Sequence, residues 1–267
     1  MSSRRIEETF SRLRRQRRTG LIPFLTVGFP TVDATLELVP ALEGAGAAAI
    51  ELGVPFSDPL ADGATIQAAS FHALKHGVML GTCLEVCRVL RQRGVAMPIV
   101  LMGYYNPVLS YGIEGFAQEA ARCGVDGLIA VDLPPEESAE LRAALATRGL
   151  DLVHLLAPTS TEERIALVSA TATGFIYCVS LAGVTGARDE LPSGVFDLLR
   201  RVRAHTQLPL AVGFGISRRE HVRAVGEQAQ AAVVGSALLN VIDCAPPGEI
   251  VQRACRFVAE LAGNSRP

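Results

Sequence analysis

Short apolar runs without alternating polar residues recur along the chain, and each is followed by a longer amphipathic segment. Strands that are covered on both faces have this unbroken apolar character, which is typical of parallel sheets. Alternating strand and helix patterns with short connections indicate repeated βα units. The eight predicted strands are Leu21–Val27, Ala48–Leu52, Ile99–Met102, Gly127–Val131, Leu152–Leu156, Phe175–Val179, Leu208–Val212 and Ala231–Val234.

Apolar residues at helical spacing predict a helix after each of these strands. The predicted helices are Val32–Glu43, Cys83–Arg93, Ile113–Cys123, Glu136–Thr147, Thr161–Ser169, Val195–His205, Arg218–Glu227 and Glu249–Leu261. The second and third strands lie about twice as far apart as the others, which leaves room for an inserted helix at Thr65–His76.

Eight βα units in a chain of 267 residues match the count and size of a (β/α)₈ TIM barrel. A doubly wound open sheet is the alternative, and such sheets often carry a G-x-G-x-x-G turn after the first strand. The first strand here ends in Thr26-Val-Gly-Phe-Pro30, which lacks that turn. We therefore predict an α/β fold with one TIM-barrel domain over residues 1–267 and an insertion after strand 2.

The first 18 residues contain seven arginines, yet Ile6, Phe10 and Leu13 fall at helical spacing. Glu7 and Glu8 and the lack of a following apolar segment argue against a targeting peptide. We expect residues 1–18 to form a helix that caps the bottom of the barrel. An anion-binding arm is the alternative interpretation.

Composition narrows the range of functions. The net charge of -2 argues against a general nucleic-acid-binding protein, and no apolar run approaches the roughly 18 residues of a membrane span. The six cysteines include no C-x-x-C pair, which favours small core residues in a reducing, cytoplasmic environment.

Lysine is almost absent, since Lys75 is the only one in the chain. Schiff-base chemistry requires a lysine amine, and Lys75 lies in a predicted helix rather than at a strand end. His72 and His76 are four residues apart, but the glutamate of an H-E-x-x-H motif is missing. We expect neither a cofactor nor a metal ion in this chain.

Two carboxylates are the strongest candidates for chemistry. Glu51 closes the second apolar run, and a carboxylate at the end of a buried strand is costly unless it has a partner or a task. Asp62 lies in the following loop, where it could also be an ordinary turn residue before Gly63. Two carboxyls in different environments at the active end of a barrel form a candidate acid/base pair.

Glycine clusters follow the last three predicted strands, at Gly183-Val-Thr-Gly186, Gly213-Phe-Gly-Ile-Ser217 and Gly235-Ser236. Glycines allow the backbone to approach an anion, and loops 7 and 8 of these barrels often bind phosphate. We expect a phosphorylated substrate, with tight turns as the alternative. Arg188 lies between Gly186 and Gly194 in a stretch that suits either a lid or a solvated connection.

Several motifs occur together and in order, and with them the chain resembles the tryptophan synthase alpha chain family from about residue 20 to the C-terminus. The motifs are Phe24-Leu-Thr-Val-Gly-Phe-Pro30, Glu51-Leu-Gly-Val-Pro-Phe-Ser-Asp-Pro-Leu-Ala-Asp-Gly63, Met102-Gly-Tyr-Tyr-Asn-Pro107, Asp132-Leu-Pro-Pro-Glu-Glu-Ser138, Ala157-Pro-Thr-Ser160 and the three glycine clusters above. The resemblance implies cleavage of indole-3-glycerol phosphate to indole and glyceraldehyde 3-phosphate, in L-tryptophan biosynthesis.

The resemblance also implies roles for individual residues. Glu51 would be the general acid/base, and Asp62 would bind the indole N–H. Thr185 would be the lid residue that meets Asp62. Phe24, Tyr104 and Tyr177 would line the substrate pocket. The implied phosphate site comprises Gly186, Gly213, Gly215, Gly235 and Ser236.

A partner is implied as well: a beta chain that carries pyridoxal phosphate, in an alpha2-beta2 heterotetramer. The segments that would face it contain Pro55, Asp58, Pro59, Asn106 and Pro107. Ala64 and Val131 stand where proline is usual in the family, which affects the expected fit to the partner more than the chemistry.

Three alternatives stay open at this point. The chain could act as a lyase without a partner and release free indole. It could serve mainly as a binding subunit that activates a beta chain, although the presence of Glu51 and Asp62 opposes this. It could also be a different phosphate-binding barrel, such as an isomerase.

Overall fold

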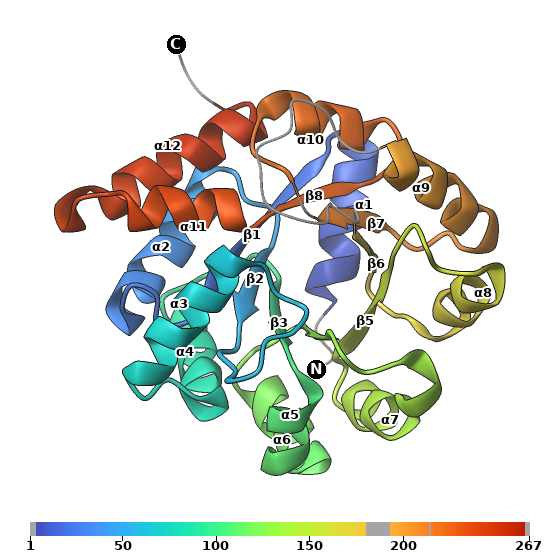
Figure 1. Ribbon diagram of the computed structural model, residues 1–267, viewed down its shortest axis with the longest axis horizontal. Helices are drawn as coiled ribbons and strands as arrows, with labels where there is room; N and C mark the ends of the chain where they lie inside the picture. Colours follow the sequence, from blue (N-terminus) through green and yellow to red (C-terminus); the bar gives the residue numbers. More distant parts are fainter. Residues whose placement is uncertain (1–3, 180–192, 214, 265–267) are drawn as a thin grey trace.

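Eight parallel strands close into a barrel in the order β1 to β8 (Figure 1). The structure is a computed structural model, and it describes residues 4–179, 193–213 and 215–264. β1 pairs with both β2 and β8, so the sheet closes on itself; the predicted TIM barrel is confirmed and the open sheet was wrong. The strands are β1 (Gly20–Thr26), β2 (Ile50–Gly53), β3 (Ile99–Gly103), β4 (Gly127–Ala130), β5 (Asp151–Leu156), β6 (Ile176–Val179), β7 (Leu210–Gly213) and β8 (Ala231–Val234).

Helices surround the barrel, and the predicted insertion after strand 2 is present as α3 (Figure 1). The α-helices are α1 (Arg5–Gln16), α2 (Val32–Ala45), α3 (Ala64–Lys75), α4 (Leu80–Gln92), α5 (Tyr105–Tyr111), α6 (Ile113–Arg122), α7 (Ala139–Thr147), α8 (Glu162–Thr171), α9 (Ser193–His205), α10 (Arg219–Gly226), α11 (Ser236–Asp243) and α12 (Ile250–Ala262), with 3₁₀ turns η1 (Pro135–Glu137) and η2 (Pro247–Glu249). The short helix α5 was not predicted, because its Asn-Pro pair suggests a turn.

Alternation along each strand separates two apolar layers. On β2, Ile50 and Leu52 point outward into the layer between the strands and the helices, whereas Ala49, just before the strand, points into the barrel. Val100, Ile129 and other small or branched residues fill the lower interior. Glu51 lies on the same face as Ala49, so its carboxyl is directed into the barrel rather than toward the helices.

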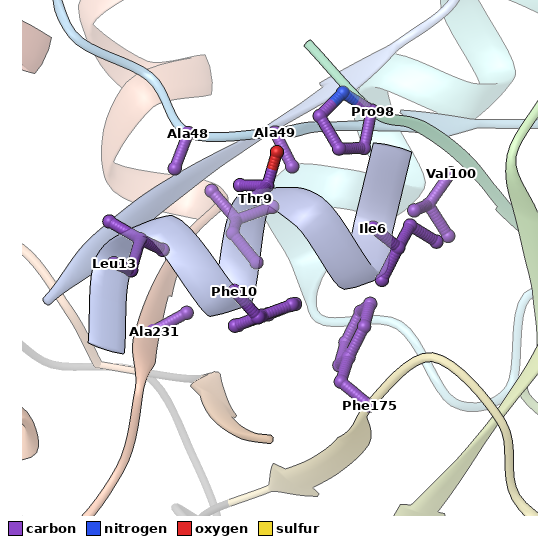
Figure 2. A pocket seen from close by; sticks show the side chains of 11 residues that line it. Ile6, Thr9, Phe10, Leu13, Ala48, Ala49, Pro98, Val100, Phe175 and Ala231 are labelled. Carbon is purple, nitrogen blue, oxygen red and sulfur yellow. The ribbon is translucent and has the colours of Figure 1, made fainter. Parts of the chain in front are cut away.

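Helix α1 closes the end of the barrel where the strands begin. Ile6, Phe10 and Leu13 are buried among interior residues, and the ring of Phe10 lies 5.5 Å from that of Phe175. In Figure 2 these side chains line one small cavity together with Ala48, Val100, Phe175 and Ala231. The remaining cavity is about 10 Å³, room for no more than one water molecule. The predicted capping helix is confirmed.

A buried carboxylate fastens α1 to the barrel. Asp126, just before β4, is 1% exposed. Its carboxylate accepts hydrogen bonds from Arg5 at 3.0 Å, from Arg91 at 2.5 Å and from the Ile99 amide at 2.8 Å. Arg5 is therefore engaged in fixing the helix to the barrel.

None of the helices in residues 4–179, 193–213 and 215–264 combines the length and the apolar character that a membrane span requires.

Candidate active site at the mouth of the barrel

Glu51 is buried inside the barrel without a hydrogen-bonding partner. Its side chain is 0% exposed, and neither carboxyl oxygen makes a hydrogen bond with any of the described residues. Burial disfavours the charged form and raises the pKa of Glu51 to about 8. A carboxyl of this kind holds a proton near neutral pH and can still lose it to a base, as a group that works as both acid and base must.

Asp62 lies in the loop between β2 and α3, at the same end of the barrel as Glu51. The Asp62 amide donates to the Pro59 carbonyl at 3.0 Å, and the side-chain amide of Gln67 donates to the Asp62 carbonyl at 2.9 Å. Partial burial raises the pKa of Asp62 to about 6, while a hydrogen bond with the Tyr104 side chain acts in the opposite direction. Asp62 therefore titrates below Glu51, so the two carboxyls differ in charge near neutral pH.

Tyr104, which follows β3, is the main anchor of this loop. Its hydroxyl accepts a hydrogen bond from the Ala61 amide at 2.9 Å. The ring of Phe56 stacks on the Tyr104 ring with centroids 4.9 Å apart. The Asp62 loop is thus held at two points by one side chain. Sequence reasoning missed Phe56 and Gln67 as loop anchors, because only the folded loop reveals their partners.

The hydroxyl of Tyr177 on β6 is influenced by both carboxyls. Tyr177 is buried, and both burial and the negative charges of Glu51 and Asp62 raise the pKa of its hydroxyl. Both carboxyls therefore lie within electrostatic reach of the same phenol. Tyr177 stays a neutral phenol, which can donate a hydrogen bond to a charged group.

Phe24 forms the β1 side of the site. It is paired in register with Glu51 and packs against Ala69 of α3 and Leu239 of α11. A Cβ atom at Gly53 would stand 2.5 Å from the Phe24 ring, so the ring occupies space that only glycine leaves free. The apolar insertion helix therefore covers the candidate site on this side.

The late glycines lie where a phosphate site was predicted. Gly213 ends β7, Gly215 has a positive φ of 77°, and Gly235 caps α11, whose first residue is Ser236. Free amides at the start of a helix favour an anion. Thr185, Gly186 and Arg188 lie outside the described residues.

Val131 and Ala64, which stand where proline is usual in the family, lie in different backbone environments. Val131 donates its amide to the Gly103 carbonyl at 3.0 Å, a bond that proline could not make. Ala64 is the first residue of α3, a position that also suits proline. Valine at position 131 therefore adds one link between the β3 and β4 ends beside Tyr104.

His72 and His76 do not form a metal site with other side chains. His72 bonds the Pro30 carbonyl at 2.8 Å, and His76 bonds the His72 carbonyl at 2.8 Å. Across the portion of the chain that the structure describes, no three His, Cys, Asp or Glu side chains are grouped to hold a metal ion.

Comparison with known proteins agrees with this geometry. The sequence profile of the tryptophan synthase alpha chain family matches residues 10–263. The tryptophan synthase alpha chain of Roseiflexus castenholzii is 59% identical over 259 residues, which is 97% of this chain and 99% of the relative.

Solved structures agree as well. Tryptophan synthase subunit alpha from Legionella pneumophila superposes with a TM-score of 0.88 at 35% identity, covering 99% of this chain and 98% of the other. A chain from the tryptophan synthase a2b2 complex of Pyrococcus furiosus superposes with a TM-score of 0.86 at 43% identity. The match covers 91% of this chain and 98% of the other. With the profile and the relative both spanning nearly the whole barrel, the chain belongs to the tryptophan synthase alpha chain family.

Proposed function

We propose that this chain cleaves indole-3-glycerol phosphate to indole and glyceraldehyde 3-phosphate, as the alpha chain of a tryptophan synthase in the cytoplasm. Family membership supports the reaction. The observation that carries it is the pair of carboxyls at the barrel mouth, one with its pKa raised to about 8 and one to about 6. Near neutral pH the first carboxyl holds a proton and the second is largely charged. The reaction requires one proton donor and one negative charge of this kind.

In the proposed reaction, proton transfers drive the cleavage of one carbon–carbon bond. Protonated Glu51 donates its proton to the indole ring carbon that bears the glycerol chain, and the ring becomes an iminium-like cation. The carbon–carbon bond breaks as the adjacent glycerol hydroxyl loses its proton to the Glu51 carboxylate, so the glutamate ends protonated again. The bond electrons return to the ring and release neutral indole.

Asp62 supports this step from the other side of the ring. As a carboxylate it accepts a hydrogen bond from the indole N–H, and its charge stabilises the cation that develops in the transition state. Tyr104 holds Asp62 in place. Phe24 and Tyr177 supply walls for the indole and glycerol parts of the substrate.

The phosphate of the substrate would bind at the ends of β7 and β8. Gly213, Gly215, Gly235 and Ser236 offer backbone amides there, and we assign Gly186 and the lid residue Thr185 from the family pattern. Fixing the phosphate orients the reacting bond and supplies binding energy remote from the chemistry.

We propose a tryptophan synthase beta chain as the partner, in an alpha2-beta2 assembly. Large apolar side chains near the Asp62 loop support this: Leu60 is 93% exposed, and Leu109 on α5 is 54% exposed. Exposed apolar residues beside an active site are what a protein interface would cover. Pro55, Pro59 and Pro107 lie in the same two segments.

The test of the reaction is release of indole from indole-3-glycerol phosphate, followed by a colorimetric indole assay. We expect turnover by the unmodified chain and its loss in Glu51→Gln, with phosphate-ligand binding nearly unchanged because the site keeps its shape. Wild-type turnover by Glu51→Gln would refute the assigned role. Rates measured with and without a beta chain test the partner, since activity that is strong alone and unaffected by it would oppose the complex.

A further inference from the structure

A second buried polar group on the active face lacks a hydrogen-bonding partner. Thr26 is the last residue of β1, and its side chain is 1% exposed. Its hydroxyl oxygen is buried and makes no hydrogen bond within residues 4–179, 193–213 and 215–264. Such a group is unfavourable in a folded protein unless a ligand or another group completes it. The proposed reaction described above leaves Thr26 without a role.

The register of the strands places Thr26 beside the catalytic pair. Thr26 shares a face of β1 with Ile22 and Phe24, which contribute to the interior, so its side chain is directed to the same side. Thr26 pairs with Gly53, two residues beyond the Phe24–Glu51 pair toward the mouth of the barrel. Gly53 has no side chain, so it offers the Thr26 hydroxyl no partner.

The position of β1 in the barrel suggests what the hydroxyl meets. β1 lies between β8, which leads to Gly235, and β2, which carries Glu51. A Cβ atom at Gly235 would stand 3.7 Å from the Phe24 side chain, so the end of β8 adjoins this part of β1. A substrate held by its phosphate at Gly235 and by its reacting carbon at Glu51 must cross in front of β1.

We infer that the Thr26 hydroxyl is a substrate-binding group that hydrogen-bonds the central hydroxyl of the glycerol chain, the one on the carbon between the reacting carbon and the phosphate-bearing carbon. This inference rests on the proposed function. Glu51 takes the proton of the other hydroxyl, on the reacting carbon. The two hydroxyls of the glycerol chain are thus bound by side chains of two adjacent strands, Thr26 of β1 and Glu51 of β2. Thr26 thereby selects for a hydroxylated chain between ring and phosphate.

The experiment compares two ligands in a Glu51→Gln background, which prevents turnover. One is indole-3-glycerol phosphate. The other is 3-(indol-3-yl)propyl phosphate, which keeps the ring and the phosphate but lacks both hydroxyls. By titration calorimetry we expect Thr26→Val to raise the dissociation constant of indole-3-glycerol phosphate about tenfold. The dissociation constant of the propyl phosphate should rise less than about twofold. Thr26→Ser, which restores a hydroxyl, should recover most of the loss.

Two controls separate binding from folding. The melting temperature of Thr26→Val should be equal or higher, because an unpartnered buried hydroxyl is removed. Ser169 on α8 also has a buried unpartnered hydroxyl, and Ser169→Ala should change neither affinity. If Thr26→Val does not fold, Thr26→Ala gives the same comparison.

Equal weakening of both ligands, or of neither, would overturn the inference. In those cases the Glu51→Gln parent still binds both ligands, so the proposed function stands. If the parent binds neither ligand, the proposed function and the inference fail together.

Discussion

The hydroxyl of Tyr104 holds both the backbone and the carboxyl of the segment that carries Asp62. It accepts a hydrogen bond from the Ala61 amide at 2.9 Å, and it is hydrogen-bonded to the Asp62 side chain. Tyr104 comes from the end of β3, whereas Asp62 follows β2, so the end of one strand positions the loop that follows the neighbouring strand. This bond also keeps the pKa of Asp62 below the value that burial alone would give it.

Tyr104→Phe should therefore raise the pKa of Asp62 above about 6. The loss of one hydrogen bond to a carboxylate corresponds to about one pH unit. In the proposed mechanism Asp62 binds the indole N–H as a carboxylate, so activity should fall as pH decreases through this pKa. The acid limb of kcat/KM against pH should move upward by about that amount.

The neighbouring Tyr105 supplies a matched control. Burial and the charges of Glu140 and Glu137 raise the pKa of Tyr105, and Asp62 is not among the causes. Tyr105→Phe should leave the acid limb unchanged. An unshifted profile in Tyr104→Phe would show that the tyrosine does not control Asp62.

Glu51→Gln should also change how stability depends on pH. The folded protein keeps the Glu51 proton up to about pH 8, whereas the unfolded chain releases it near 4.5. The folded state thus binds more protons over this interval, and the free energy of unfolding decreases as pH rises through it. The neutral amide has no such titration, so the variant should gain roughly 2–4 kcal/mol relative to the wild type at pH 9.

Urea unfolding at pH 5 and pH 9 measures this difference. At pH 5 the two proteins should be similar, because Glu51 is protonated in the folded state and pH 5 lies only slightly above the value near 4.5 at which the unfolded chain releases this proton. The same relative stability at both pH values would mean that Glu51 is not buried as a neutral acid.

Gly213→Ala should disturb Tyr177. A Cβ atom at residue 213 would stand 2.0 Å from the Tyr177 hydroxyl, a distance at which one of the two must move. Because Tyr177 is buried, its ring has little room, and we expect a loss of about 1–3 kcal/mol in the free energy of unfolding together with at least about a tenfold loss of kcat.

Gly235→Ala is the control for this prediction, because its added methyl group would contact a bound phosphate without displacing protein atoms. Its added Cβ would meet no atom closer than 3.7 Å, so the melting temperature should be unchanged. Its KM should rise if the phosphate lies against this backbone. Equal melting temperatures for both variants would contradict the steric argument at Gly213.

Phe10→Ala should lower stability without changing the chemistry. Phe10 fills the base of the barrel against Phe175, at the opposite end from Glu51. Removing a buried phenyl ring costs about 3–5 kcal/mol. We expect denaturant unfolding to show this loss, kcat to stay within about twofold below the unfolding transition, and Ser11→Ala on the exposed face of α1 to have no effect. A large fall in kcat would indicate that the base of the barrel communicates with its mouth.

Local pattern was sufficient for the barrel and for its helical plug. Unbroken apolar strands such as Ile99–Gly103 require cover on both faces, and only a ring of helices around a packed interior provides it. Ile6, Phe10 and Leu13 repeat at helical spacing, so their common burial follows from the helix itself. Glu51 and Asp62 were also evident, because charge at the end of an apolar strand and in the next loop is visible in one dimension.

Tertiary structure was needed to identify contacts between segments that are distant in the sequence. No spacing rule relates Tyr104 to Ala61, Arg5 to Asp126, or Gly213 to the Tyr177 hydroxyl, because each pair meets only after the strands have taken their places around the ring. The unpartnered Thr26 hydroxyl is of the same kind. In the sequence it is an ordinary strand threonine, since burial and the lack of a partner are properties of everything that surrounds a group, which the order of residues along the chain does not contain.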